Sequence, residues 1–273
     1  MSATLAADDG RTAEARGGGR PARAAWTGAA LAFGGLGALL LGWWVGTELL
    51  PAPASFIRRF SPGSAFGALA RLATGPDLGL HVAVSLRRVA VGLALALAIG
   101  VPLGLAVGRS RPFDAATAPA FQFLRMISPL SWMPIAVMVF GVGDRPIYFL
   151  LAFAALWPIL LNTAAGVRSL DPQWLQVAES LSATRSETLR KVILPGILGQ
   201  VLTGIRLSIG IVWIILVPAE MLGVSAGLGY FILDTRDRLA YDELAATVLV
   251  IGLLGFGLDA AARFAGRLWT RDA

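Results

Sequence analysis

Residues 171–195 read DPQWLQVAESLSATRSETLRKVILP. Asp171 is a favourable N-cap residue and Pro172 suits the first position of a helix, so a helix is predicted to begin here. Ser182 and Ala183 are expected to end it. One broad face of this first helix is apolar and consists of Trp174, Leu175, Val177, Ala178 and Leu181.

A second short helix is predicted directly after the first. Thr184 and Glu187 stand three residues apart, which is the spacing of a capping box, and Pro195 is expected to stop the helix. Its apolar face consists of Leu189, Val192 and Ile193. Its positive charges are Arg185, Arg190 and Lys191. The two helices form an amphipathic hairpin, which is suited to bind a groove on another protein or a lipid surface.

The chain on both sides of the hairpin is apolar enough for a bilayer. Hydrophobic residues make up 56% of the chain, charged residues 15%, and the mean hydropathy is +0.70. Runs of about 20 apolar residues predict an all-α integral membrane protein of about six transmembrane helices. The expected spans are 26–45, 89–107, 116–140, 146–165, 197–219 and 244–262. Because both ends of the hairpin are tethered beside spans, a DNA-reading helix-turn-helix is disfavoured.

The third expected span is interrupted by charged and helix-breaking residues. Arg125, Ser128-Pro129 and Met133-Pro134 all fall within residues 116–140. Prolines in a membrane helix free carbonyl groups that must be satisfied by neighbours or by water. This span is therefore expected to line a cavity or to pack at a helix interface.

Three parts of the chain are expected from these patterns. Residues 1–24 are too polar to form a core and are expected to be a disordered cytoplasmic tail. Residues 25–80 are expected to hold the first transmembrane helix and an external segment, and residues 81–273 the membrane core. A cleaved signal peptide is the alternative for the first helix, since residues 52–54 read APA, but the apolar run is long for a signal peptide.

The distribution of positive charge predicts the orientation. Six spans place both termini on one side, and most basic loops share the side of the arginine-rich tail, which is expected to be the cytoplasm. These loop residues are Arg109, Arg111, Arg168, Arg185, Arg190, Lys191, Arg267 and Arg271. The opposite side also carries arginines, several of them with acidic neighbours. The net charge of +6 therefore indicates orientation in a membrane, and no nucleic acid is expected as a partner.

The residue inventory excludes several kinds of chemistry. The chain has no cysteine and one histidine, His81, which excludes disulfides, zinc clusters and Cys/His nucleophilic pairs. Its only lysine, Lys191, follows Arg190, so no phosphate-binding loop ending in Gly-Lys-Ser/Thr exists. Residues 223–227 read GVSAG, the pattern of a serine-hydrolase elbow, but no strand is predicted before them and a tight turn is expected. No catalytic, cofactor-binding or metal-binding residue is assigned.

Uphill transport would then need energy from a partner chain or from an ion gradient. The hairpin favours a partner chain. An ion-driven secondary carrier remains the alternative, although no internal repeat is visible. A membrane enzyme is disfavoured for want of a nucleophile, base or metal ligands.

Part of the hairpin resembles the signature of the binding-protein-dependent permeases of ABC importers. That signature reads Glu-Ala-Ala, three residues, Gly, nine residues, then Ile-x-Leu-Pro. This chain has Gln176-Val177-Ala178, Ser182 and Val192-Ile193-Leu194-Pro195 at these places. Gln176 thus replaces the family's Glu and Ser182 its Gly, which is unfavourable if the turn needs a positive φ. Glu179, one turn from Gln176, could supply the missing carboxylate.

The resemblance implies the type I ABC importer permease fold, with the hairpin as a cytoplasmic coupling helix that docks into a cleft on a separate ATPase. The implied partners are two ABC ATPase subunits, which hold ATP and Mg²⁺, a second permease copy and a soluble or lipid-anchored substrate-binding protein. The implied location is the bacterial plasma membrane. The expected coupling residues are Trp174, Gln176, Ala178, Glu179, Leu181, Ser182, Ala183, Arg190, Val192 and Pro195.

Three further stretches are similar to the subgroup that imports nitrate, cyanate, bicarbonate, taurine and alkanesulfonates. They are SPLSWMP at residues 128–134, NTAAGV at 162–167 and AEML at 219–222, and they look closest to the nitrate and cyanate branch. The resemblance implies import of a small anion, nitrate-, nitrite- or cyanate-like, with taurine or an alkanesulfonate as the alternative.

Polar residues in or beside the spans are candidates for the substrate pathway, because an ionisable group in hydrocarbon costs roughly 2.5–3.5 kcal/mol. Arginines could attract an anion, amide and hydroxyl groups could donate hydrogen bonds, and Glu220 could pair with an arginine on a neighbouring helix. Arg206 could instead snorkel, and Asp259 could pair with Arg263. The candidates are Arg125, Ser128, Asn162, Thr163, Arg206 and Glu220.

Overall fold

A computed structural model describes residues 31, 34–52 and 55–272, with side chains as far as Gly266. The regular structure in these ranges is helical, and they contain no strand, as the all-α prediction requires. The chain divides into two compact units, Met1–Gly63 and Ser64–Ala273. The expected tail, residues 1–24, lies outside the described residues. The expected divisions after residues 24 and 80 stay predictions.

The first unit is described from residue 31 onward, with gaps. Residues 34–44 are helical, and a π-helical turn, η1 (Val45–Leu49), continues them. A 3₁₀ segment, η2 (Phe56–Phe60), folds back so that the indole N–H of Trp43 donates to the carbonyl of Phe60 at 2.9 Å. The expected first span, 26–45, begins outside the described residues, and its described part is helical.

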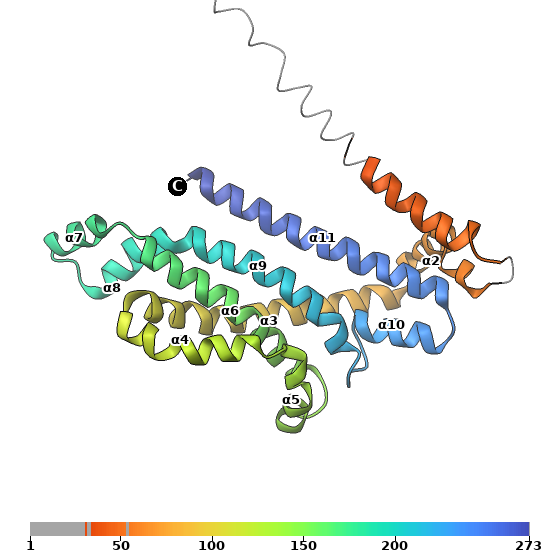
Figure 1. Cartoon of the computed structure of the whole chain (residues 1–273), viewed down its shortest axis with the longest axis horizontal. Helices are drawn as coiled ribbons and strands as arrows, with labels where there is room; N and C mark the ends of the chain where they lie inside the picture. Colours follow the sequence, from red (N-terminus) through yellow and green to blue (C-terminus); the bar gives the residue numbers. More distant parts are fainter. Residues whose placement is uncertain (1–30, 32–33, 53–54, 273) are drawn as a thin grey trace, which may run out of the picture. The chain divides into compact units, whose positions relative to one another are not determined.

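The second unit begins in the first turn of α2 and consists of helices and short helical turns. In chain order they are α2 (Pro62–Thr74), α3 (Pro76–Arg109), α4 (Arg111–Met126), η3 (Pro129–Trp132), α5 (Met133–Phe140), α6 (Asp144–Ser169), α7 (Pro172–Ser180), α8 (Arg185–Thr188), η4 (Leu189–Ile193), α9 (Leu194–Glu220), α10 (Leu228–Asp237) and α11 (Tyr241–Asp272). Figure 1 shows α7 and α8 at one end of this unit, called here the hairpin end, and α10 at the opposite end, called the α10 end.

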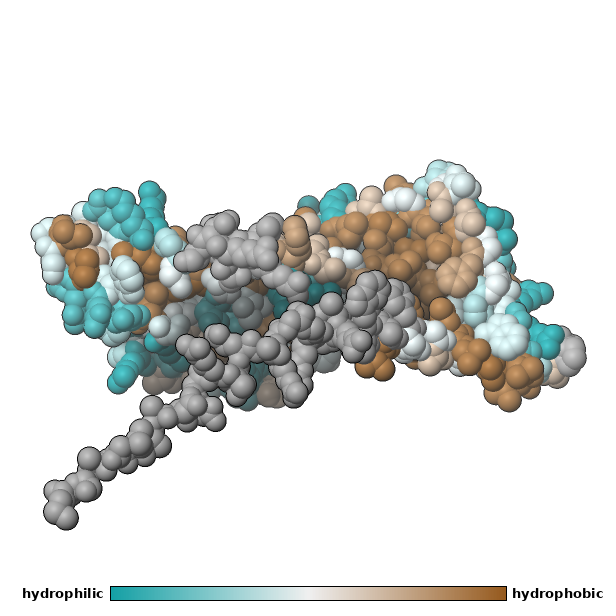
Figure 2. Space-filling model, turned by 90° about the horizontal axis from the view of Figure 1, so that it is seen from above, coloured by the Kyte–Doolittle hydropathy of each residue, from teal (hydrophilic) through white to brown (hydrophobic). Residues whose placement is uncertain are grey.

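Four helices of the described chain are long and apolar enough to cross a membrane: α3, α6, the run from α8 to α9, and α11. The pair formed by α4 and η3–α5 passes the same test but is bent by 87°. The described residues thus hold four candidate spans, or five with this pair, and the first expected span lies partly outside them. Apolar atoms cover a broad part of the face seen in Figure 2, and hydrophilic atoms gather toward its ends.

The third expected span is not one continuous helix, which corrects the sequence-based boundaries. Proline disfavours the helical conformation in the residue before it, and Ser128, before Pro129, is extended with φ −58° and ψ +128°. Ile127 is also extended, with ψ +126°. The chain therefore leaves α4 at this point and turns before α5. The second expected span also differs, because α3 begins at Pro76 instead of residue 89.

The core of the second unit is a close contact between α3 and α6. Small residues recur every four positions along one face of α3, and this spacing keeps them on one side of the helix. They are Gly92, Ala96, Gly100, Gly104 and Gly108. A Cβ added at Gly104 would lie 2.6 Å from the Cβ of Thr163 and 2.7 Å from the carbonyl of Leu160. The α3 backbone thus lies directly against α6.

The second hairpin helix does not stop at Pro195, so that prediction is wrong. α8 runs through the π-helical turn η4 into α9, and Pro195 lies in the first turn of α9. In the π-turn the N–H of Leu194 donates to the carbonyl of Leu189, five residues back. Because this wider turn precedes the proline, the helix continues past a residue that has no N–H to donate.

Candidate functional site

The expected hairpin is present at the hairpin end, with its predicted caps. The side chain of Asp171 accepts a hydrogen bond from the N–H of Gln173 at 2.9 Å and caps α7. The capping box forms in both directions: the N–H of Glu187 donates to the Thr184 hydroxyl at 3.3 Å, and the N–H of Thr184 donates to the Glu187 carboxylate at 2.9 Å. The local sequence therefore fixes where both helices begin.

Ser182 occupies the left-handed turn that glycine would favour. Its φ is +55°, and the turn has both hydrogen bonds of a Schellman motif. The N–H of Ala183 donates to the carbonyl of Ala178 at 3.0 Å, and the N–H of Ser182 donates to that of Glu179 at 2.8 Å. The turn expected from the signature is thus formed without its glycine, at the expense of backbone strain at Ser182.

The face of α7 that was expected to be uniformly apolar is divided between two sides. Ala178 is buried and Leu175 is half-buried, whereas Trp174, Val177 and Leu181 are exposed, Leu181 to 77%. The exposed three border a cavity of about 1060 Å³, called here the outer pocket. Its other walls include Ser182, Ala183, Val192 and Pro195. A water-exposed apolar cavity of this size on short helices is typical of a docking surface.

The remaining expected coupling residues lie around this pocket or behind it. Gln176 and Arg190 are exposed and do not line it. Glu179 is exposed and lines a different cavity on the inner side of the hairpin. Of the ten expected coupling residues, the outer pocket brings together Trp174, Ala178, Leu181, Ser182, Ala183, Val192 and Pro195.

A second cavity, of about 560 Å³, lies at the break between α4 and α5 and is called here the membrane cavity. Its walls come from the end of α4, from α6 and from α9, and they include Arg125 and Asn162. Arg125 is exposed and has no hydrogen-bond or ion-pair partner among the described residues. The amide of Asn162 donates to the carbonyl of Pro158 at 2.8 Å. The break in the third span thus lines a cavity, as its prolines led us to expect.

Trp157 also lines the membrane cavity, and sequence reasoning missed it. Its indole N–H is buried and has no hydrogen-bond partner within the described part of the chain. A buried donor without a partner is costly unless water or a ligand satisfies it. The cavity therefore offers a guanidinium and an amide on apolar walls, and Trp157 forms part of those walls.

A buried ionic network lies at the α10 end and centres on Arg88 of α3. Its guanidinium donates to Glu220 of α9 at 2.7 Å and to the carbonyl of Ala226 at 2.7 Å. It also contacts Asp144, the first residue of α6, at 2.6 and 2.9 Å. Arg88 is 2% exposed and Glu220 is 0% exposed. The network joins three helices.

The same network holds the loop that follows α9. The hydroxyl of Ser85 lies 2.7 Å from a Glu220 oxygen and accepts a hydrogen bond from the N–H of Leu228 at 2.9 Å. The N–H of Gly227 donates to Nδ1 of His81 at 3.1 Å. Gly227 has φ +122°, and a Cβ there would lie 2.5 Å from Arg88 Nη1. The serine-hydrolase pattern at residues 223–227 is thus part of a turn anchored by the histidine.

Residues 100–271 match the model of the family described as binding-protein-dependent transport system inner membrane component. The chain belongs to this family.

Several characterised relatives of this permease transport different small molecules. It is 39% identical over 189 residues, 68% of each chain, to the bicarbonate transport system permease protein CmpB of Synechococcus elongatus. It is 36% identical over 193 residues, 70% of this chain and 69% of the relative, to the nitrate import permease protein NrtB of Leptolyngbya laminosa. It is 32% identical over 239 residues, 85% and 86% of the two chains, to the taurine transport system permease protein TauC of Escherichia coli. The expected subgroup is confirmed.

Solved structures show the same fold. A chain of the MetNI methionine ABC transporter has a TM-score of 0.58 at 16% identity, covering 68% of this permease and 92% of that chain. A chain of an amino acid ABC transporter has a TM-score of 0.51 at 15% identity, covering 81% and 100%. The type I ABC importer permease fold is therefore confirmed. The family match and the named relatives support a multi-pass membrane protein of the transport permease class.

The structure separates the other pathway candidates of the permease from the membrane cavity. Thr163 is fully buried against Gly104 of α3, and its hydroxyl donates to the carbonyl of Ile159. Ser128 is exposed at the start of η3 and does not line the cavity. Glu220 is fully buried and forms an ion pair with Arg88. None of these three residues lines the membrane cavity.

Arg206 lies on a different side of α9, facing α11. Its Nε is 3.5 Å from a carboxylate oxygen of Asp259, which also contacts Arg263 one turn later on α11. Arg125 and Asn162 are therefore the expected pathway residues that share one cavity. Sequence reasoning missed Arg88, Ser85 and Asp144; the signal was an arginine directly beside the apolar run of α3.

Proposed function

We propose that this permease imports a small anion and that residues 171–195 are its docking element for an ABC ATPase subunit. The observation that carries the proposal is the exposed apolar stripe of Trp174, Val177 and Leu181 beside the outer pocket. Apolar side chains at this density favour burial against a partner. The hydrogen-bonded turn at Ser182 holds the stripe in place without any partner.

The proposed assembly contains two copies of this chain, two ATPase subunits and a substrate-binding protein. Both termini and the hairpin lie in the cytoplasm, where the ATPases bind ATP and Mg²⁺; this chain binds no cofactor. Closure of the ATPase pair moves the hairpins together and opens the pathway outward, and release after hydrolysis reopens it inward. The absence of a phosphate-binding loop in the sequence supports this division of labour.

The membrane cavity supports an anionic substrate. Arg125 attracts negative charge, while the Asn162 amide offers a neutral donor. Nitrate-like oxyanions are our first candidates, and bicarbonate joins them because the bicarbonate permease CmpB is 39% identical. Taurine is the second candidate, because the similarity to TauC extends over 85% of the chain.

Substitutions in the outer pocket test the docking element. Leu181→Asp and Val192→Asp place a charge on the apolar surface, so we expect both to lose the co-purifying ATPase and to abolish uptake. Val142→Asp is the matched control for ATPase binding, because Val142 is also 77% exposed but lies in the loop before α6. Normal assembly and uptake in both hairpin variants would contradict the docking assignment.

Labelled uptake in a strain lacking the gene identifies the substrate. Nitrate, cyanate, bicarbonate, taurine and an alkanesulfonate would each be supplied at a limiting concentration. Loss of nitrate, cyanate or bicarbonate uptake supports an oxyanion, and loss of taurine or sulfonate uptake supports the second candidate. Arg125→Gln in the complemented strain should lower uptake of that anion, whereas Arg206→Gln, outside the cavity, should retain it.

A further inference from the structure

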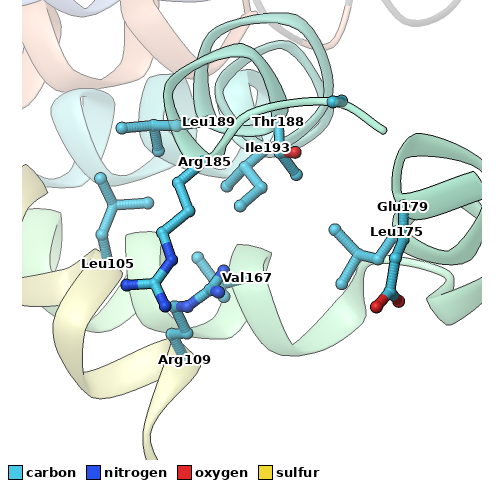
Figure 3. Close-up of a pocket in the computed structure, with 10 residues that line it drawn as sticks. Leu105, Arg109, Val167, Leu175, Glu179, Arg185, Thr188, Leu189 and Ile193 are labelled. Carbon is cyan, nitrogen blue, oxygen red and sulfur yellow. The ribbon is translucent and has the colours of Figure 1, made fainter. Parts of the chain in front are cut away.

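The inner side of the hairpin encloses a cavity of about 500 Å³ that none of the proposed transport steps uses. Figure 3 shows its walls, which come from the ends of α3 and α6, from α7 and from the run of α8 and η4. This inner pocket is lined by Leu105, Arg109, Val167, Leu175, Glu179, Ala183, Arg185, Thr188, Leu189 and Ile193.

Two arginines from separate elements enter the inner pocket. Arg109 is the last residue of α3 and Arg185 the first of α8, and Figure 3 shows the side chain of Arg185 extending toward that of Arg109. Glu179 lies on the opposite wall. The two guanidinium groups therefore share one cavity whose remaining walls are mostly apolar.

The charges of these two arginines are not balanced within the described chain. Neither guanidinium has a hydrogen-bond or ion-pair partner among residues 31, 34–52 and 55–266. Two neighbouring cations are paired: Arg168 lies 2.8 Å from Asp114, and Lys191 lies 3.7 Å from Glu187. Both side chains are exposed to solvent, and an anion between them would relieve the repulsion of two like charges that share one pocket.

The geometry points to a binding site for one phosphate-like oxyanion, held by Arg109 and Arg185 in the inner pocket. Two planar guanidinium forks match the oxygens of a phosphate, and they do so better than ammonium groups would. A bound oxyanion would tie the inner face of the hairpin to the end of α3, opposite the outer pocket. It would thereby limit how far the hairpin can move relative to the membrane helices.

The oxyanion could come from the phosphate of an anionic phospholipid or from free phosphate in solution. The inner pocket lies at the ends of two spans, α3 and α6, so a lipid headgroup at the membrane surface is within reach. Both sources present the same chemistry to the two arginines. The inference does not depend on which anion the permease transports.

Native mass spectrometry of the purified full chain tests the site and distinguishes the sources. In one arm the protein is released from nanodiscs of phosphatidylcholine with phosphatidylglycerol, and in the other it is incubated with inorganic phosphate in phosphatidylcholine. We expect wild type to retain one phosphatidylglycerol or one phosphate, and Arg109→Gln with Arg185→Gln to weaken retention at least tenfold. Retention of the lipid alone or of phosphate alone would support the site and name its source.

Two further variants separate site binding from general charge. Arg111→Gln removes an exposed arginine two residues from Arg109 that does not line the inner pocket, so it should retain the adduct. Arg185→Lys keeps the positive charge but loses the planar, two-pronged donor geometry of the guanidinium. It should therefore bind the oxyanion more weakly than wild type and more tightly than Arg185→Gln. Equal adducts in wild type and the double variant, or equal loss in Arg111→Gln, would overturn the proposal.

Discussion

The α10 end of the second unit buries an ionic network, whereas the hairpin end exposes apolar side chains. At the α10 end, Arg88 and Glu220 are nearly inaccessible and every partner is within hydrogen-bonding distance. At the hairpin end, Trp174 and Leu181 remain exposed although the backbone turn beside them is fully bonded. The first arrangement stabilises this chain by itself, and we propose that the second is completed by a partner.

The largest effect on stability is expected from breaking the buried network. Glu220→Ala leaves Arg88 without one carboxylate in a buried site, so the free energy of unfolding should fall by about 3–5 kcal/mol. Denaturation by SDS in mixed micelles, followed by circular dichroism, measures the change. Asp237→Ala is the control, because it removes an exposed pair with Arg236 at the same end and should change stability by less than about 1 kcal/mol. Similar losses in both variants would contradict the contrast between the two ends.

A smaller loss is expected from overpacking the α3–α6 contact that connects the two ends. In Gly104→Val the new side chain meets Thr163 and the Leu160 carbonyl, so the free energy of unfolding should fall by about 1–3 kcal/mol. Gly79→Ala, on the same helix with no atom near its added Cβ, should instead stabilise by roughly 0.5–1 kcal/mol. The same SDS titration compares them, and a neutral Gly104→Val would show that the helices are not in close contact.

Ser182→Gly should relieve strain at the hairpin turn. Because Ser182 has φ +55°, glycine should stabilise the turn by about 1 kcal/mol, and Ser182→Val should destabilise it. Hydrogen exchange of the Ala183 amide, which is bonded to the Ala178 carbonyl, should slow about fivefold in the glycine variant. Faster exchange in Ser182→Gly would mean that the serine side chain stabilises the turn in a way the backbone does not show.

The smallest effect on stability is expected from Leu181→Asp. Leu181 is 77% exposed, so the free energy of unfolding should change by less than about 0.5 kcal/mol although ATPase binding is lost. SDS titration of the isolated chain measures this. A large loss of stability would mean that Leu181 supports the fold of this chain and not an interface.

The hairpin could be predicted from sequence because its signals are local. Asp171, Pro172, Thr184 and Glu187 act on backbone groups within a few residues, and all form the expected caps. The prediction that the second helix ends at Pro195 was wrong. A π-turn before Pro195 lets the helix continue although proline has no N–H to donate, and such a turn has no simple local signature in the sequence.

The buried network could not be predicted in full because its members come from distant parts of the chain. Glu220 was expected to pair with an arginine, but nothing in the sequence shows that Arg88, 132 residues away, is the partner. The cavity at the third span was foreseen from its prolines. The part played by Trp157 was not foreseen, because its place in the cavity wall and its unpaired, buried indole N–H are visible only once the neighbouring helices are placed.

The central claim is that the exposed face of the hairpin binds the ATPase, and cysteine cross-linking tests it most directly. The chain contains no cysteine, so Leu181→Cys introduces a single thiol in the outer pocket and Val142→Cys a single thiol of equal exposure in the loop before α6. With a short bifunctional reagent in membranes, we predict that Leu181→Cys cross-links to the ATPase subunit and Val142→Cys does not. No cross-link from Leu181→Cys in a transporter that still imports substrate, or equal cross-linking from both positions, would contradict the account.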